Sequence, residues 1–294
     1  MLVQFCISIF FCSCSMVNFS IIIPHKDIPD LLQRCLDSIP QREDIEIIVV
    51  DDGSHTVPSV DREDVTLIAL QQNGGAGHAR NIAMSHAHGK WILFIDADDF
   101  FLPNAFDTLD RYIDSDKEIC LFYPKRYYSD NLEPAKILYP RNHFMEYFMG
   151  HFSKRMLLLK QMVPHGKMIR RQFFLDHPDI IFPESLAAED LLWNAKVAVN
   201  VRSIDVIDAA LYAFTIRRES LTHQITYDHM MSIYQQFLDL HDYLREHNVP
   251  YQCYPHTRGM EMAKKVGGNA PEEMLEYIKS IGRYEEYLEE KNTL

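Results

Sequence analysis

The hydrophobic positions form two alternating patterns over about the first 125 residues. Short runs rich in β-branched or aromatic residues, each closed by Pro, Gly or polar residues, predict strands. Between these runs, apolar residues recur three and four positions apart, which is the spacing of one helix face. We expect strands over 19–24, 45–50, 65–70, 91–95 and 119–124, helices over 28–39 and 102–114, and a loop leading into a helix over 74–89.

Strands that alternate with helices in this order predict βαβ units. Such units build a mostly parallel sheet with helices on both faces, so the expected fold class is α/β. In such sheets, ligands bind beyond the carboxyl ends of the strands. Polar clusters follow four of the expected strands, with the sequences "PHKD", "DDGS", "NGGAGHARN" and "DADD". One crevice at that edge of the sheet should therefore collect all four.

The pattern becomes less regular after about residue 125. The remaining apolar spacing predicts a helix over 141–162, a short helix over 167–178, a stronger helix over 186–199, one or two strands within 202–217, and helices from about 227 onward. No internal repeat or flexible linker interrupts the chain. We therefore expect an α/β domain over 16–222 and a helical C-terminal region over 223–294.

Residues 1–15 are apolar but fit neither a signal peptide nor a spanning helix well. They include Gln4 and no Lys or Arg, whereas a signal peptide needs a basic start and a spanning helix needs about 20 apolar residues with flanking charge. Met16 stands directly before the first expected strand. Two interpretations stay open, a non-native extension of a chain that starts at Met16, and a weak membrane anchor.

Charge and cysteine content narrow the class of protein. The formal net charge is −13, which argues against a general nucleic-acid-binding protein because such proteins carry an excess of Lys and Arg. None of the 6 cysteines forms a CxxC pair. This usage is typical of a reducing compartment, so we expect a cytoplasmic protein with no nucleic-acid partner.

The segment "WILFIDADDFFLPN" places three carboxylates at the end of a buried strand. In an extended chain Asp96 and Asp98 would face one way and Asp99 the other. Carboxylates so close together repel unless a cation lies between them, and hard oxygen ligands suit Mg²⁺ or Mn²⁺. The alternative is a solvated turn in which Asp99 caps a helix that starts near Leu102.

Two further polar clusters have both a functional and an ordinary interpretation. Asp51 or Asp52 could accept hydrogen bonds from a nucleobase or ribose, but "DDG" is also common turn chemistry. The loop with Gly75 and Arg80 is neither a Walker loop nor a full GxGxxG motif. It offers glycines that let a ligand approach the backbone and an Arg on a first helical turn, or it is a surface loop.

The segment "LAAEDLLW" puts Glu189 and Asp190 at the expected start of a helix. Carboxylates there commonly stabilise the helix dipole. The functional alternative is a general base.

In their order along the chain, these segments resemble those of family 2 glycosyltransferases with the GT-A fold, of the bacterial polysaccharide type. The resemblance is close over about 17–125 and extends more loosely to 220. The connector "PHGKMIRRQFF" is similar to that family's W-x-K-L-Y-R-R-x-x-F element, with His165 in place of the aromatic residue. The quoted segments are "SIIIPHKDIPDLLQRCLDSI", "EIIVVDDGS", "NGGAGHARNIAMSHAHGKWILFIDADD" and "AAEDLLW".

The resemblance implies an inverting enzyme that moves a sugar from a nucleotide-sugar donor, with UDP expected, to a hydroxyl of a saccharide or lipid-linked acceptor. Pro24 and His25 would border the base pocket, and Asp51 or Asp52 would contact the uracil. Lys26 stands where many members of the family have Tyr. Because a Lys cannot stack on a base as Tyr does, the choice of nucleotide stays open.

The resemblance also implies a cofactor and a base. Asp96 and Asp98 match the DxD motif, which implies Mn²⁺ or Mg²⁺ bridging the phosphates of the donor. Asp190 matches the acid of the family's "ED" motif, the usual base, and in that role we expect no large shift of its pKa. The expected substrate-binding set is Pro24, His25, Asp51, Asp52, Gly75, Arg80, Asp96, Ala97, Lys167 and Glu189.

Three alternatives to this function stay open. A nucleotidyltransferase on a similar sheet would also bind a nucleotide and a metal, although no Gly-rich loop with a following Arg or Lys comes after the first strand. A non-catalytic sugar-nucleotide binding protein would keep the fold without the reaction. A dinucleotide oxidoreductase fits least, given Arg80 and the three aspartates.

A basic set between residues 143 and 171 carries positive charge in an otherwise acidic chain. It is either a solvated helix that covers the sheet, or a surface for anionic lipid headgroups or a diphosphate-linked acceptor. The second interpretation predicts peripheral contact with the inner face of the membrane. The set is Lys154, Arg155, Lys160, Lys167, Arg170 and Arg171.

Overall fold

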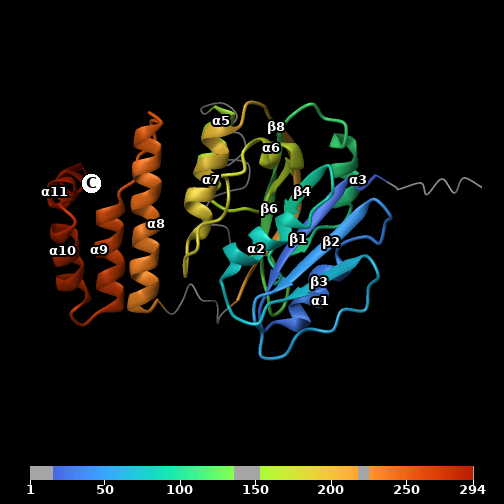
Figure 1. Ribbon diagram of the computed structural model, residues 1–294, viewed down its shortest axis with the longest axis horizontal. Coiled ribbons are helices and arrows are strands. Elements are labelled where there is room, and N and C mark those ends of the chain that lie inside the picture. Colours follow the sequence, from blue (N-terminus) through green and yellow to red (C-terminus); the bar gives the residue numbers. More distant parts are fainter. Residues whose placement is uncertain (1–15, 136–152, 218–224, 294) are drawn as a thin grey trace, which may run out of the picture.

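The computed structural model of the chain describes residues 16–135, 153–217 and 225–293. Within these residues, strands form one sheet (Figure 1). The strand order is β3-β2-β1-β4-β7-β6-β8-β5. The strands are β1 (Phe19–His25), β2 (Ile45–Asp51), β3 (Val65–Ala69), β4 (Trp91–Phe94), β5 (Phe100–Phe101), β6 (Ile119–Tyr128), β7 (Lys167–Arg170) and β8 (Ile204–Ile216).

The sheet is mostly parallel, as the alternation of strands and helices predicts. β1 is parallel to β2 and β4, β2 is parallel to β3, and β6 is parallel to β8. β7 is antiparallel to both β4 and β6, so those two neighbours share one direction. The carboxyl ends of β1, β2, β4, β6 and β8 therefore lie at one edge, where the reversed strand β7 begins.

Helices cover both faces of the sheet (Figure 1). On one face, α2 and α7 pack on a buried cluster that includes Ile22, Phe94 and Trp193. On the other face, α1 and α3 pack on a cluster that includes Trp91 and Phe106. The helices are α1 (Pro29–Asp37), α2 (Ala76–Ser85), α3 (Ala105–Leu109), η1 (Asp110–Tyr112), α5 (Lys154–Lys160), α6 (Arg171–Asp176) and α7 (Glu189–Asn200).

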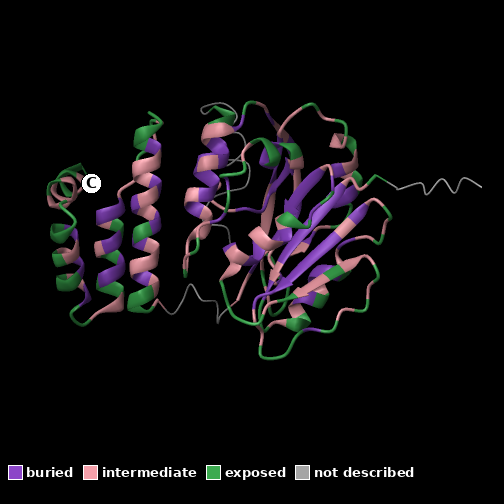
Figure 2. Ribbon diagram, viewed as in Figure 1, coloured by how far each residue is buried: buried purple, intermediate pink, exposed green. Residues whose placement is uncertain are grey.

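Within residues 225–293, four helices extend the fold, as expected for the C-terminal region. α8 packs against α7 and contributes Leu240 and Leu244 to the core of the sheet. Its other side contributes Met230 and Tyr234 to a separate buried cluster among the last helices, which appears as a buried seam in Figure 2. The four helices are α8 (Tyr227–Glu246), α9 (Pro255–Val266), α10 (Ala270–Ser280) and α11 (Tyr284–Thr293).

Two expected helices differ from the structure. The segment 167–178 begins as strand β7, in which Met168 and Ile169 point into the cores on opposite faces, and only the residues of α6 are helical. The expected helix over 102–114 shrinks to α3 and η1. Asn104 before α3 has a φ of 62°, and Phe100 and Phe101, just before the expected helix, pair with β8.

The other expected elements after residue 125 agree more closely with the structure where it is described. The segment 202–217 forms the single strand β8, and α7 begins three residues later than the expected start at 186. The expected helix over 141–162 lies outside the described residues up to 152, and α5 occupies part of the rest. Among the described residues, no helix combines the length and apolar character that crossing a bilayer requires.

Candidate active site

Arg80 joins two segments that lie far apart in the sequence. Its guanidinium is buried and lies 2.7 Å from Asp96 Oδ1 and 2.8 Å from Glu189 Oε1. The guanidinium carbon also lies 5.3 Å from the centre of the Phe182 ring. Burial alone would raise the pKa of Asp96, but the Arg80 charge outweighs burial and holds that pKa below its usual value. The "DADD" and "ED" segments therefore meet at one edge of the sheet.

The glycines before Arg80 allow this approach. Gly75 has a φ of +89°, and Asp52 accepts hydrogen bonds from the backbone amides of Gly74 and Gly75 at 2.7 and 2.8 Å. A methyl group on Gly75 would come within 3.3 Å of the Ser185 carbonyl oxygen. The loop therefore packs on the segment that leads into α7, and Asp52 fixes its conformation.

The ends of β1 and β2 form a second buried polar group. His25 Nδ1 lies 2.8 Å from Asp51 Oδ1, and both side chains are buried. His25 Nε2 accepts a hydrogen bond from the Ile28 amide at 3.3 Å, which assigns the proton to Nδ1 and makes it the donor to Asp51. Pro24 precedes this pair on β1, and the Lys26 ammonium lies over the backbone carbonyls of Asp52 and Gly53 at 3.4 and 3.5 Å.

The carboxylates of "DADD" have three different environments. Residues 97–98 form a turn closed by a hydrogen bond from the Asp99 amide to the Asp96 carbonyl at 2.9 Å. The expected extended geometry, with Asp96 and Asp98 on one side, is therefore wrong. The Asp98 carboxylate lies 2.9 Å from Arg217 Nε.

Asp99 is buried, so the alternative in which it caps a solvated helix end is also wrong. It accepts hydrogen bonds from the Tyr212 hydroxyl at 2.5 Å and the Thr215 amide at 2.6 Å. Burial and the neighbouring charges of Asp96 and Asp98 raise its pKa well above the usual value. Asp99 therefore ties the turn to β8.

His165 closes the site from the segment before β7. Its ring stacks on Tyr212 with centres 4.5 Å apart and planes 7° apart, where the family pattern has an aromatic residue. Its buried Nδ1 makes no hydrogen bond and lies 3.9 Å from Asp96 Oδ2. Burial lowers the pKa of His165 to about 4, so the ring is neutral at neutral pH.

The chemistry of this group suits a divalent cation. One ligand atom each from Asp96, Asp99 and His165 lie within 4.8 Å of one another. The carboxylate oxygens of this group suit Mn²⁺ or Mg²⁺, and the unpaired His165 nitrogen is a further potential ligand. Asp98, on the same turn, could add a further carboxylate if it exchanged Arg217 for a metal.

Glu189 and Asp190 begin α7 after Ala188, which has a φ of 63°. Arg80 holds Glu189, which leaves Asp190 as the carboxylate without that partner. Burial, reinforced by the Glu189 charge, raises the pKa of Asp190 to about 7. This finding corrects the expectation of no large shift. A carboxylate with a pKa near neutrality is suited to accept a proton at physiological pH.

Lys167 is fully buried at the start of β7. Its ammonium donates to the backbone carbonyls of Gln161, at 3.2 Å, and Val163. Burial lowers its pKa to about 7, and the charge of Asp190 partly opposes that shift. Lys167 therefore fixes the segment that carries His165, rather than lying on a surface.

Sequence reasoning missed the contribution of β8. Tyr212, Thr215 and Arg217 from the carboxyl half of this strand and the residue after it contact all three aspartates or their backbone. One signal was available, because Arg217 directly follows a strand whose carboxyl end lies at the same edge. The apolar letters around Tyr212 gave no indication of its hydroxyl contacts.

The described members of the basic set contribute to packing. Arg155, Arg170 and Arg171 donate to the backbone carbonyls of Val201, Lys117 and Ala87. The Arg170 guanidinium lies 4.7 Å from the centre of the Trp91 ring, and Lys154 donates to the Ile204 carbonyl at 2.9 Å. These contacts, with the burial of Lys167, favour the interpretation of a segment that covers the sheet.

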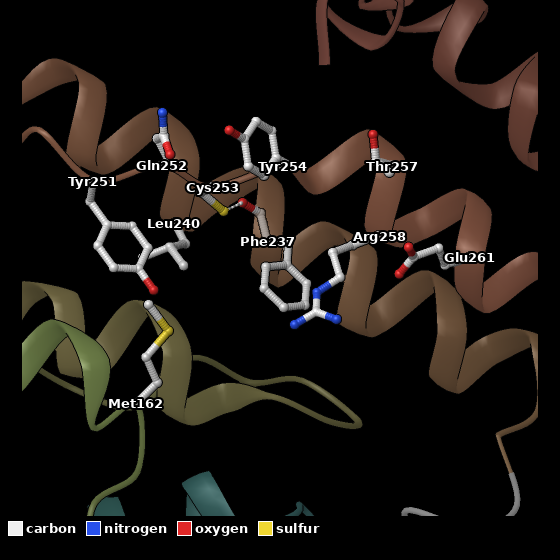
Figure 3. A pocket seen from close by; sticks show the side chains of 10 residues that line it. All are labelled: Met162, Phe237, Leu240, Tyr251, Gln252, Cys253, Tyr254, Thr257, Arg258 and Glu261. Atoms are coloured by element: carbon white, nitrogen blue, oxygen red, sulfur yellow. Dashed lines mark hydrogen bonds between the residues drawn. The ribbon is translucent and has the colours of Figure 1, made fainter. Parts of the chain in front are cut away.

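A separate cavity of about 260 Å³ lies where α8 and the start of α9 meet the end of α5 (Figure 3). Met162, Phe237 and Leu240 form its apolar side. The Arg258 guanidinium lies 5.7 Å from the centre of the Phe237 ring. None of its lining residues belongs to the group around Asp96, so we place the active site at the edge of the sheet.

Comparison with known proteins identifies the class to which this fold and site belong. Residues 20–177 match the model of glycosyl transferase family 2, which covers more than half of the chain. The chain therefore belongs to glycosyl transferase family 2. This membership confirms the expected family and the enzyme class of glycosyltransferases.

Two relatives have a similar identity to this chain but differ in how much of their own length it covers. The poly(ribitol-phosphate) beta-N-acetylglucosaminyltransferase TarS of Staphylococcus aureus is 26% identical over 245 residues, which cover 78% of this chain and 40% of TarS. The glycosyltransferase EpsJ of Bacillus subtilis is 25% identical over 294 residues, which cover 90% of this chain and 83% of EpsJ. The chain thus spans about two fifths of the length of TarS.

Solved structures confirm the GT-A fold. The chain superposes on residues 1–349 of S. aureus TarS in complex with UDP-GlcNAc with a TM-score of 0.60, 21% identity, and coverage of 92% of this chain and 89% of that chain. The mannosyltransferase PcManGT from Pyrobaculum calidifontis, in complex with GDP-Man and Mn²⁺, gives a TM-score of 0.54 at 16% identity, with coverage of 92% and 82%.

Proposed function

We propose that this protein is an inverting, metal-dependent glycosyltransferase that moves a sugar from a UDP-sugar to a hydroxyl of a saccharide or lipid-linked acceptor. The observation that carries the proposal is the Arg80 bridge, with distances of 2.7 Å to Asp96 and 2.8 Å to Glu189. It brings the proposed donor motif and the proposed base to one edge of the sheet. The UDP-GlcNAc in the TarS complex supports the choice of donor class.

The nucleotide would lie over the ends of β1 and β2. Pro24 and the His25–Asp51 pair would form the wall of the base pocket, and Lys26 would lie at its rim. Asp52 is held by two backbone amides of the glycine loop. Its remaining lone pairs could still accept from a ribose or base, while Gly75 lets the donor approach the backbone.

A divalent cation would be held by the "DADD" turn, and Mn²⁺ in the PcManGT complex supports this assignment. Asp96 and Asp98 are the proposed ligands, and Asp99 and His165 lie close enough to contribute. When bound, the metal neutralises charge that develops on the leaving diphosphate. Ala97, between the two aspartates, is buried in the cluster that includes Trp91, so we expect it to fix the turn through packing rather than by contact with the donor.

Asp190 would accept the proton of the acceptor hydroxyl as that oxygen attacks the anomeric carbon. One displacement from the face opposite the leaving group inverts the anomeric configuration, through an oxocarbenium-like transition state. Glu189 is engaged with Arg80. Lys167 would act indirectly, by holding the segment that carries His165.

The decisive experiment incubates the purified chain with a panel of sugar nucleotides and Mn²⁺ and identifies the nucleotide product. Release of UDP, reduced in Asp190→Asn, is the expected result. Release of pyrophosphate would instead indicate a nucleotidyltransferase. A donor that binds but is never converted, with any acceptor offered, would indicate a binding protein.

A further inference from the structure

We propose that Arg217 is a resident cation that occupies the metal's place beside Asp98 until the metal and the donor arrive, and that it then pairs with the donor diphosphate. This inference rests on the proposed function and adds a switching residue to it. Arg217 Nε lies 2.9 Å from Asp98 Oδ2. Asp98 is one of the two carboxylates that the DxD pattern assigns to the metal.

The two arginines at the "DADD" turn are held very differently. The Arg80 side chain is only 5% exposed and has two carboxylate partners, so it is a permanent part of the site. The Arg217 side chain is 30% exposed, and within the described ranges its ion-pair partner is Asp98, which is 22% exposed. Of the two, Arg217 is therefore the arginine that can be displaced.

The backbone around Asp98 is fixed, so that only its side chain can change partner. The Asp98 carbonyl accepts hydrogen bonds from Arg34 at 2.5 Å and from the Thr215 hydroxyl at 2.7 Å. Thr215 and Arg217 are two residues apart at the end of β8, and side chains two apart in an extended chain lie on the same side. Thr215 thus holds the backbone of the turn, and Arg217 covers the Asp98 carboxylate.

Charge balance explains why the displacement of Arg217 from Asp98 requires both the metal and the donor diphosphate. Three carboxylates within four residues repel, and Arg80 and Arg217 offset that repulsion in the donor-free chain. A divalent cation at Asp98 would replace the Arg217 charge and push the guanidinium away. A donor diphosphate supplies new oxygens for that guanidinium, because an arginine fork matches phosphate geometry. Metal and donor should therefore bind cooperatively, each favouring the other's site by the same factor.

The test measures metal binding without turnover. Free Mn²⁺ is titrated by electron paramagnetic resonance into the wild-type chain and into Arg217→Gln, Arg217→Lys and Arg202→Gln. Arg202 is an exposed cation before the start of β8, so its substitution removes the same charge away from the site. We expect Arg217→Gln to bind Mn²⁺ alone about two- to tenfold more tightly than the wild type, and Arg202→Gln to match the wild type.

A second titration measures the effect of UDP on the affinity for Mn²⁺. In the wild type UDP should tighten Mn²⁺ binding, and in Arg217→Gln this tightening should be smaller, with Arg217→Lys intermediate. Equal or weaker Mn²⁺ binding by a folded Arg217→Gln, or an unchanged effect of UDP, overturns the proposal. Asp98→Ala separates the two hypotheses, because unchanged Mn²⁺ affinity in that variant would refute the metal assignment itself.

Discussion

Gly77 lies so close to Glu189 that a methyl group on its α-carbon would stand 2.9 Å from Glu189 Cγ. The first turns of α2 and α7 thus approach each other where no side chain separates them. Arg80, on the same helix as Gly77, uses this approach to reach Glu189 across 109 residues of sequence. The Arg80 bridge between the "DADD" and "ED" segments therefore depends on residue 77 having no side chain.

Gly77→Ala should therefore weaken the site although Ala favours a helix by about 1 kcal/mol over Gly. Overpacking typically costs about 1–3 kcal/mol, and here the least resisted shift moves Glu189 away from Arg80. We expect slower transfer and an unfolding free energy unchanged or lower by about 1–2 kcal/mol, measured in urea. Ser85→Ala, at the exposed end of the same helix, is the control and should keep both properties. Normal transfer by Gly77→Ala would show that the close approach has no functional consequence.

Asp190→Asn tests the base. Removing a general base typically slows a reaction by about 10²–10⁴-fold, whereas removing a helix-dipole partner costs about 1 kcal/mol of stability and no chemistry. We expect Asp190→Asn to lose most transfer while donor binding and Tm stay near those of the wild type. Glu189→Gln should reduce the rate of transfer less than Asp190→Asn does. Near-normal turnover by Asp190→Asn would assign the role of base to another residue, with His165 or His223 the next candidates; His223 lies outside the described residues.

The pH dependence follows from the environment of Asp190, whose pKa burial and Glu189 raise to about 7. A base must be deprotonated to act, so transfer should fall about tenfold per pH unit below 7. The sign for stability is opposite, because the folded chain holds this proton more tightly than the unfolded chain between about pH 4 and 7. Stability from this group is therefore lost as pH rises through 7. At pH 8 Asp190→Asn should melt at the same temperature as the wild type or a higher one. A rate that is flat from pH 5 to 8 would contradict the assignment.

The sequence predicted the sheet well because its strands are buried on both faces. Segments such as Ile45–Asp51 are almost continuously apolar, and their alternation with helices leaves few alternatives to a parallel sheet. The sequence wrongly predicts a helix at strand β7, because only Lys167–Arg170 form this strand and two of these four residues are basic. Such a short segment has no period of its own, and its pairing between β4 and β6 decides its structure.

For the candidate site, the sequence predicted the location at the edge of the sheet but not the contacts between side chains. The rule on carboxyl ends gathered Asp51, Asp96 and Arg80 correctly in one region. It could not show that Arg80 would bridge to Glu189, or that Asp96 and Asp98 would pair with different arginines. Side-chain partners across more than 100 residues depend on how the elements pack. That packing also explains why Tyr212 was missed, since an isolated tyrosine in a strand more often indicates a core residue.

Asp98 and Asp99 are adjacent carboxylates, but we expect their substitution to affect different properties. Asp98→Ala should affect transfer, and Asp99→Ala should affect stability. The Asp98 side chain has a partly exposed ion pair, and such pairs contribute about 0–1 kcal/mol to stability. Asp98→Ala should therefore keep the Tm and abolish metal-dependent transfer. The Asp99 side chain is buried and accepts from Tyr212 and the Thr215 amide. Asp99→Ala leaves both donors unpaired, at about 1–3 kcal/mol each.

Thermal unfolding and transfer, measured on the same preparations, separate these two roles. Asp99→Ala should lower the Tm by several degrees, because about 1 kcal/mol shifts the Tm by about 2–4 °C in a chain of this size. Residual transfer by Asp99→Ala should keep its dependence on Mn²⁺, since the Asp98 carboxylate remains. Full activity of Asp98→Ala in EDTA would refute a metal at this turn. A large loss of stability in Asp98→Ala would show that its pair with Arg217 is structural, and would leave no exchangeable partner for the metal to displace.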